Sequence, residues 1–113
     1  MNASEEACVI MTTAGSQEEA DRIAEILVEE KLAACVQILD IRSRYIWEGK
    51  VCREPEQLLL IKTFATLYPQ VEAAIIRHHS YEVPEILQVP VTTGLDCYIS
   101  WMRENTRPVQ DQK

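Results

Sequence analysis

The sequence predicts one α+β domain with the ferredoxin-like element order βαββαβ, a long hairpin between its second and third strands, and an added C-terminal helix. Three observations predict this fold. Short runs rich in β-branched residues alternate with segments whose apolar residues recur at helical spacing. A single turn signal, Glu48-Gly49, divides a long strand-like segment. At 113 residues and 12.9 kDa the chain is the size of one compact domain, so we expect one domain over 1–113, with 1–6 and 106–113 loose.

The first strand is expected over 7–13, where "ACVIMTT" is apolar and β-branched and a glycine follows shortly after. Ser16 lies three residues before Glu19, which is the spacing of a capping box, so a helix is expected to begin there. The apolar positions that follow have helical spacing and extend this helix to about Leu32.

The hairpin turn at Glu48-Gly49 pairs Trp47 with Lys50 and Leu39 with Leu58, because glycine readily adopts the positive φ of a two-residue loop. The segment 34–47 spans ~46 Å when extended, whereas a compact domain of this length is ~35 Å across. The far part of the hairpin must therefore overhang or bend. A two-stranded ribbon with aromatic side chains is marginal alone in water, so we expect oligomerisation.

Proline positions predict two local features of the strands. Pro55 interrupts the return strand opposite Arg42, and we expect a bulge or kink there because proline cannot donate to the ladder. In the segment "VPEILQVPV", Pro90 predicts that the short fourth strand lies at an edge of the sheet.

Two further helices follow from caps and spacing. Thr66 is expected to cap the second helix, with Pro69 in the first turn of that helix. The apolar face of this helix comprises Val71, Ala74 and Ile75 and is extended by His78. Thr93 and Asp96 form a possible capping box for the last helix. The buried side of that helix is expected to present Leu95, Tyr98, Ile99 and Met102.

Charge and composition exclude several classes of partner. A net charge of −7 with no basic run disfavours nucleic acid. No apolar run approaches the length of a membrane span, and the N-terminus lacks the pattern of a signal peptide, so we expect a cytoplasmic protein. The four cysteines have no metal-knuckle or redox spacing, and we interpret them as small apolar groups.

Five stretches resemble the CutA family of divalent-cation tolerance proteins: "KLAACV" (31–36), "SRYIWEGK" (43–50), "LIKT" (60–63), "HHSYEVPEI" (78–86) and "YISW" (98–101). The resemblance covers nearly the whole chain. It implies a ferredoxin-like homotrimer whose long hairpins pair between subunits, with a role in tolerance of Cu²⁺ and other divalent ions. Animal relatives are associated with anchoring or assembling other proteins, and the trimer resembles the PII signalling proteins in shape.

The resemblance also implies a metal site at His78, His79 and Thr12, where Thr12 replaces the cysteine that the family uses. Adjacent side chains diverge by about 100° on a helix, so the two histidines need further ligands from Glu82, Glu85, Cys8 or a neighbouring subunit. The alternative is that the histidines only end a helix, where donors meet its unpaired carbonyls.

Alternation places Lys62 on the same strand face as Leu58, Leu60 and Glu56, where an unpaired ammonium is costly. We expect a carboxylate beside it, either as a structural ion pair or in a cleft between subunits that accepts a small ligand. The residues expected in that interface cleft are Tyr45, Trp47, Glu56, Lys62 and Glu85.

Three functional hypotheses follow. The first is a metal-binding or metal-responsive homotrimer with weak Cu²⁺ binding and no organic cofactor. The second is a PII-like sensor with a small-molecule site at its subunit interfaces, and the third is a stable scaffold that acts through a protein partner the sequence does not name. No nucleophile elbow, HExxH or glycine-rich phosphate loop is present, so we do not expect an enzyme.

Overall fold

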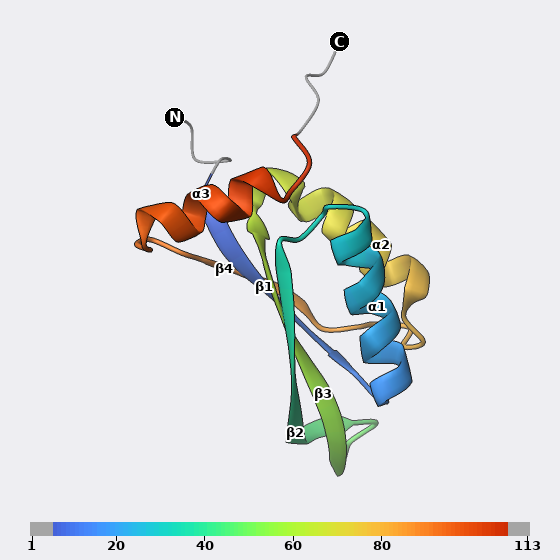
Figure 1. Cartoon of the computed structure of the whole chain (residues 1–113). Coiled ribbons are helices and arrows are strands. Elements are labelled where there is room, and N and C mark those ends of the chain that lie inside the picture. Colours follow the sequence, from blue (N-terminus) through green and yellow to red (C-terminus); the bar gives the residue numbers. More distant parts are fainter. Residues whose placement is uncertain (1–5, 109–113) are drawn as a thin grey trace.

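The computed structural model describes residues 6–108 and confirms the α+β fold class. Its elements are β1 (Ala7–Ala14), α1 (Gln17–Glu29), β2 (Cys35–Trp47), β3 (Lys50–Phe64), the 3-10 turn η2 (Ala65–Leu67), α2 (Tyr68–His78), β4 (Ile86–Pro90) and α3 (Asp96–Glu104) (Figure 1). The sheet has the order β2-β3-β1-β4, and neighbouring strands are antiparallel. β4 therefore lies at an edge, as Pro90 predicted.

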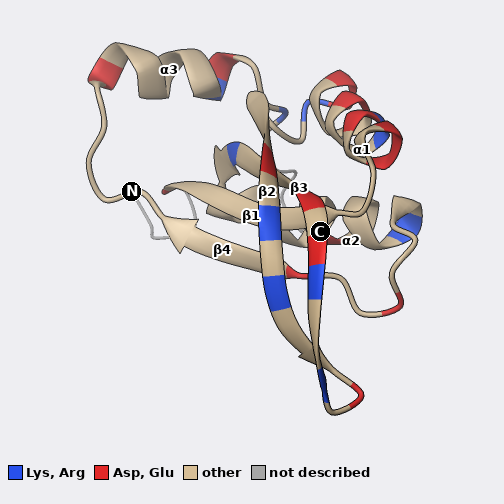
Figure 2. Ribbon diagram, turned by 90° about the horizontal axis from the view of Figure 1, so that it is seen from below, with Lys and Arg blue, Asp and Glu red and all other residues tan. Residues whose placement is uncertain are grey.

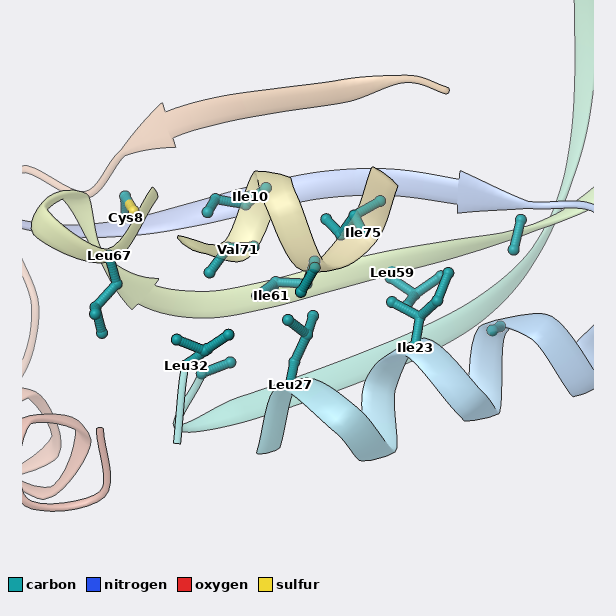
Figure 3. Close-up of a cluster of buried hydrophobic side chains, with 14 residues drawn as sticks. Cys8, Ile10, Ile23, Leu27, Leu32, Leu59, Ile61, Leu67, Val71 and Ile75 are labelled. Carbon is teal, nitrogen blue, oxygen red and sulfur yellow. The ribbon is translucent and has the colours of Figure 1, made fainter. Parts of the chain in front are cut away.

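The core lies between one face of the sheet and the helices α1 and α2 (Figure 3). Alternate residues of the central strands, such as Ile10, Leu59 and Ile61, point to this face and are fully buried. Leu27 of α1 and Ile75 of α2 meet them from the other side. Burying one such side chain contributes roughly 1.5–3 kcal/mol, so this layer holds the sheet against the two helices.

The opposite face of the sheet is covered only at one end, where α3 packs against it. Met102 of α3 forms a small cluster with Ala7 and Phe64. The predicted burial of Leu95 and Tyr98 is wrong for the single chain, because α3 reaches only this end of the face and both side chains stay exposed. The expected Thr93–Asp96 capping box is also absent, since the N-cap residue is Leu95 and makes no side-chain cap bond.

The hairpin has the predicted turn and register. Glu48 and Gly49 both have positive φ, 52° and 79°, which is typical of the two-residue turns that match strand twist. Trp47 pairs with Lys50, and Leu39 pairs with Leu58. Of the bulge or kink expected at Pro55, the bulge is wrong, because the register is continuous and Pro55 pairs with Arg42.

Pro55 fits into the strand because β3 has a free edge at this point. β1 pairs with β3 only as far as Gln57, so beyond Gln57 the hairpin continues as a ribbon of two strands (Figure 1). A proline without a donor is tolerated at such an edge. The longest dimension of the chain is 45 Å, and the ribbon overhangs the body as its length predicted (Figure 1).

Several predicted element ends are corrected. α1 ends at Glu29 rather than near Leu32, because Lys31 adopts a left-handed φ of 59° and the chain turns toward β2. Thr66 does not cap α2: it lies within η2, and Leu67 precedes the helix without a side-chain cap.

The C-terminal segment is held as far as it is described. Thr106 is buried and its hydroxyl donates to Met102 O, while Arg107 N–H donates to Lys31 O. These contacts correct the expected looseness of 106–107, and Glu6 O likewise accepts from Ala65 N–H. Of the other residues expected to be loose, 1–5 and 109–113 lie outside the described residues.

The structure also shows where the charged residues and the cysteines lie. Acidic residues are frequent along α1, and both acidic and basic residues occur along the ribbon (Figure 2). All four cysteines are free; Cys8 is buried as interpreted, whereas Cys97 is exposed. In the described part of the chain, none of the helices has the length and hydropathy to cross a membrane.

Candidate functional site

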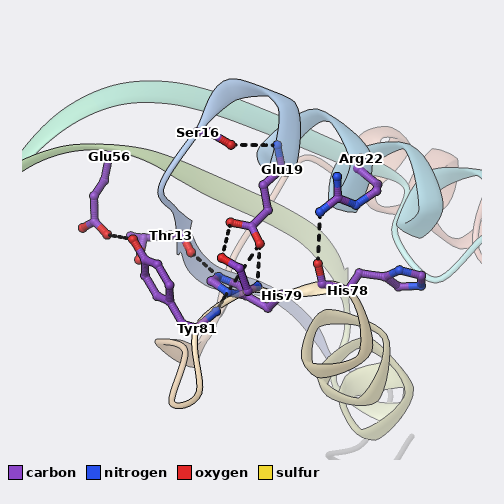
Figure 4. A network of polar contacts seen from close by, with 9 residues as sticks. Thr13, Ser16, Glu19, Arg22, Glu56, His78, His79 and Tyr81 are labelled. Atoms are coloured by element: carbon purple, nitrogen blue, oxygen red, sulfur yellow. Dashed lines mark hydrogen bonds and ion pairs between the residues drawn. The ribbon is translucent and has the colours of Figure 1, made fainter.

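The adjacent histidines mark the end of α2. The helix ends at His78, and His79 has extended backbone angles. Arg22 of α1 donates to the carbonyl oxygen of His78 over 3.5 Å. The two imidazole rings point in different directions (Figure 4). The structure therefore places the pair at a helix end, one of the two interpretations of the sequence.

His79 has both ring nitrogens engaged in hydrogen bonds. Its side chain is fully buried. Nε2 lies 2.6 Å from Thr13 O, and Nδ1 lies 3.0 Å from the backbone nitrogen of Tyr81. A carbonyl only accepts and an amide N–H only donates, so the neutral ring carries its proton on Nε2 and accepts at Nδ1. No nitrogen of His79 is left for a metal ion in this arrangement.

Glu19 joins the start of α1 to the loop after α2. Ser16 caps α1 by accepting from Glu19 N–H at 3.1 Å, as predicted, but the reciprocal half of the expected capping box does not form because the Glu19 carboxylate bonds to Ser80 instead. The Glu19 carboxylate accepts from Ser80 N–H at 2.6 Å and from the Ser80 hydroxyl at 3.1 Å. Burial alone raises the pKa of Glu19, but the hydrogen bonds from Ser80 outweigh burial and hold the pKa below its ordinary value. The carboxylate therefore stays ionised and holds the loop to α1.

The third residue of the implied metal site, Thr12, makes no side-chain hydrogen bond to either histidine within the described residues. Thr12 is fully buried, and its hydroxyl has no hydrogen-bond partner within the described residues. Burial also raises the pKa of the Cys8 thiol to about 11, which keeps this candidate ligand protonated. Among residues 6–108, no group of three or more His, Cys, Asp or Glu side chains is placed to hold a metal ion. The described residues of a single chain therefore do not fit a metal centre.

A cleft of about 560 Å³ lies where the ribbon leaves the sheet. We call it the ribbon-base cleft; it is lined by Thr13, Ser43, Arg44, Tyr45, Trp47, Cys52, Glu54, Glu56, Tyr81, Glu82, Val83 and Glu85. Strand pairing explains much of this set, because Ser43 faces Glu54 and Tyr45 faces Cys52 across the ribbon. Four of the five residues predicted for an interface cleft, namely Tyr45, Trp47, Glu56 and Glu85, are brought together here.

Lys62 does not reach this cleft. It shares a strand face with Glu56, but six residues of extended chain separate the two by roughly 20 Å. Its ammonium lies 5.7 Å from the centre of the Tyr98 ring, and no carboxylate of the described residues lies within 4 Å. The carboxylate expected beside Lys62 is thus replaced, within one chain, by an aromatic ring.

Tyr81 completes the ribbon-base cleft and was not selected from the sequence. Its hydroxyl donates to Glu56 Oε2 at 2.9 Å (Figure 4). The hydroxyl passes close to Gly15, where an added Cβ would lie only 3.0 Å from it. The sequence gives little indication of this contact. Tyr81 lies five residues before β4, and no local spacing pattern relates it to Glu56, which is 25 residues earlier in the chain.

The cleft is acidic. Its lining contains Glu54, Glu56, Glu82 and Glu85 but only one basic residue, Arg44. Burial and the Glu56 carboxylate hold the pKa of Tyr81 well above its ordinary value. Glu54 likewise raises the pKa of Tyr45. Both phenols therefore remain neutral donors, and the cleft favours cations over anions.

Comparisons with known proteins agree on one family. The family described as "CutA1 divalent ion tolerance protein" matches residues 8–105. The "Divalent-cation tolerance protein CutA" of Thermus thermophilus is 43% identical over 87% of this chain and 96% of its own length. The chloroplastic protein CutA of Arabidopsis thaliana is 41% identical over 88% of this chain, which spans 55% of that relative. The solved structure of CutA1 from Oryza sativa superposes with a TM-score of 0.90 at 36% identity and covers 96% of this chain and 100% of its own. The chain therefore belongs to the CutA1 divalent ion tolerance family.

Proposed function

We propose that this chain acts as a homotrimer in tolerance of divalent cations, without catalysis of its own. The observation that carries the role is the match to the CutA1 family over residues 8–105, together with the name of the Thermus relative, a divalent-cation tolerance protein. The four free cysteines and the absence of disulfides among them support a reducing compartment such as the cytoplasm.

The shape of the single chain supports assembly. β2 is an edge strand of 13 residues, and beyond Gln57 the ribbon has no further strand beside it. Ile46 and Trp47 near its tip are 66% and 57% exposed. Leu87 and Val89 of β4 add exposed apolar surface on the uncovered sheet face. Such an edge and face are stabilised when neighbouring copies cover them.

Weak Cu²⁺ binding in the assembly is assigned to His78 rather than His79. The His78 ring is half-buried and makes no hydrogen bond within the described residues, whereas both nitrogens of His79 are engaged. Imidazole suits Cu²⁺, and a neighbouring copy would supply the remaining donors.

The experiment is a calorimetric Cu²⁺ titration of the intact oligomer and of two single variants. His78→Ala is expected to lose binding at least tenfold. His79→Gln is expected to keep the affinity, because glutamine retains a donor and an acceptor. Equal affinity in the wild type and in His78→Ala would remove His78 from the site. Deleting the gene and comparing growth in graded CuSO₄ tests the tolerance role itself, and unchanged growth would contradict it.

A second candidate role is a small-molecule sensor. The observation that favours it is the ribbon-base cleft, whose volume of about 560 Å³ lies within the range of small-ligand sites. Thermal-shift screening of the oligomer against nucleotides, carboxylates and amines tests this role. A raised melting temperature with at least one class is expected, and no shift with any of them would count against it.

A further inference from the structure

The cleft contains a buried carboxylate with only one of its two oxygens in a hydrogen bond within the described residues. Glu56 is only 8% exposed. Oε2 accepts from the Tyr81 hydroxyl, while Oε1 has no hydrogen-bond partner among the described residues. No Lys, Arg or His nitrogen of residues 6–108 lies within 4 Å of either oxygen. The free oxygen, Oε1, is therefore available to a cationic donor that enters the cleft.

The surroundings of Glu56 hold this carboxylate in place. Tyr81, which donates to it, is fixed through its backbone N–H by His79 Nδ1. The His79 ring also packs against the Tyr81 ring, with centroids 4.7 Å apart. Gly15 leaves the space that the phenol occupies. The free oxygen is therefore positioned before any ligand arrives, which reduces the entropy lost on binding.

The walls of the cleft narrow the class of ligand. Tyr45 and Trp47 present aromatic rings on the ribbon side, and rings of this kind attract organic cations. Glu54, Glu82 and Glu85 repel phosphates and carboxylates. A bare metal ion fits poorly, because no three donor side chains of the described residues converge.

We propose that the ribbon-base cleft binds a small organic cation, an amine or guanidinium compound, through Glu56 Oε1 and the rings of Tyr45 and Trp47. This proposal rests on the sensor role and names its ligand class. A guanidinium group suits the site especially well, since it is planar, stacks on aromatic rings and donates to carboxylates in fixed directions.

The test uses the intact oligomer, with agmatine as the guanidinium probe and putrescine as the amine probe. Binding is measured by calorimetry and by thermal shift; ATP, citrate and MgCl₂ at equal ionic strength serve as comparison ligands. Glu56→Gln removes the charge at constant shape and is expected to weaken agmatine binding at least tenfold. Trp47→Leu is expected to weaken it several-fold.

Glu72→Gln is the matched control. Glu72 also accepts from a tyrosine hydroxyl, that of Tyr68 at 2.8 Å, but it lies on α2 outside the cleft. The agmatine affinity of the Glu72→Gln variant is expected to equal that of the wild type. Because both variants lose a carboxylate bonded to a phenol, a general effect of such a loss would lower affinity in both.

Three results would overturn the proposal. The first is no binding of agmatine or putrescine by the wild type, and the second is equal affinity in Glu56→Gln. The third is a double-mutant stability cycle in which Glu56→Gln and Lys62→Met are strongly coupled, while agmatine does not bind. This result would assign Glu56 to an ion pair between copies. Binding of citrate or ATP in the cleft while agmatine is silent would reject the cationic class and leave the sensor role standing.

Discussion

Two adjacent histidines have different surroundings in this chain. His79 is buried and bonded through both nitrogens, whereas the His78 ring is half-buried without a hydrogen bond among the described residues. The chain direction changes between them as α2 ends. At the scale of single residues, His79 is a structural link between β1 and the loop after α2, and only His78 has nitrogens available to a ligand.

His79→Ala is expected to destabilise the protein by roughly 2–4 kcal/mol. The change leaves Thr13 O and Tyr81 N–H without partners, and each buried unsatisfied group costs about 1–3 kcal/mol. His78→Ala is the control and is expected to change stability by less than about 1 kcal/mol. Urea unfolding at one fixed protein concentration measures both, and equal effects would contradict the different roles of the two rings.

Glu19→Gln is expected to lower stability near pH 7 by on the order of 1 kcal/mol, and less as the pH falls. The pKa of Glu19 in the folded state is below its ordinary value, so the carboxylate stabilises the fold above the unfolded pKa of about 4.3. That stabilisation is lost as the pH falls through the lower folded pKa. Urea midpoints of both proteins at pH 7, 5, 4 and 3 should converge at the acid end; a constant difference would contradict the assigned pKa direction.

At the scale of elements, the long hairpin organises the sheet and the cleft. Its turn fixes the register, and the register sets which side chains share a face with Glu56. A shift of one residue would move Tyr45 and Trp47 to the other side of the ribbon. The two-residue turn at Glu48 and Gly49 therefore determines the lining of the cleft as well as the strand pairing.

Gly49→Ala is expected to cost about 1 kcal/mol. Nothing lies within 4 Å of an added Cβ, so the cost comes from the left-handed φ of 79° alone. Glu48→Asn is the opposing variant, and a small gain is expected because Asn-Gly favours this turn type. Thermal melting ranks the three proteins, and a melting temperature of Gly49→Ala at or above that of wild type would contradict the backbone argument.

At the scale of the whole molecule, residues 6–108 of one chain leave a ribbon, a strand edge and part of a sheet face uncovered. The helices α1 and α2 cover only one face, and α3 reaches only the end of the other (Figure 1). These surfaces are the structural reason for the proposed trimer.

Ile46→Glu is expected to disrupt the proposed trimer, because a charge would be buried where the ribbon is proposed to meet a neighbouring copy. Ile76→Glu is the control, since Ile76 is 56% exposed on α2, a helix that packs on the core rather than on the ribbon. Light scattering should give three times 12.9 kDa for the wild type and the control and a smaller mass for Ile46→Glu. A wild-type mass of one chain would reject the trimer.

Local sequence predicted the parts of this protein that depend on short-range chemistry. The Ser16 cap, the Glu48-Gly49 turn and its register, and the edge position marked by Pro90 each follow from the conformations that a few neighbouring residues prefer. Local rules failed at Thr66 and at Pro55. In the first case, the packing of Leu67 overrode a possible cap; in the second, the strand edge was free and no bulge was needed.

The sequence by itself determined the element order, the hairpin register and the alternation that sets Tyr45, Trp47 and Glu56 on one face, because these depend on backbone preference and on the two-residue period of a strand. Only the tertiary structure decided that His79 bonds to Thr13 and Tyr81, that Tyr81 reaches Glu56, and that Lys62 lies beside Tyr98. Those contacts join residues up to 66 positions apart, and no local pattern encodes which distant side chains the packing of helices on a sheet brings together.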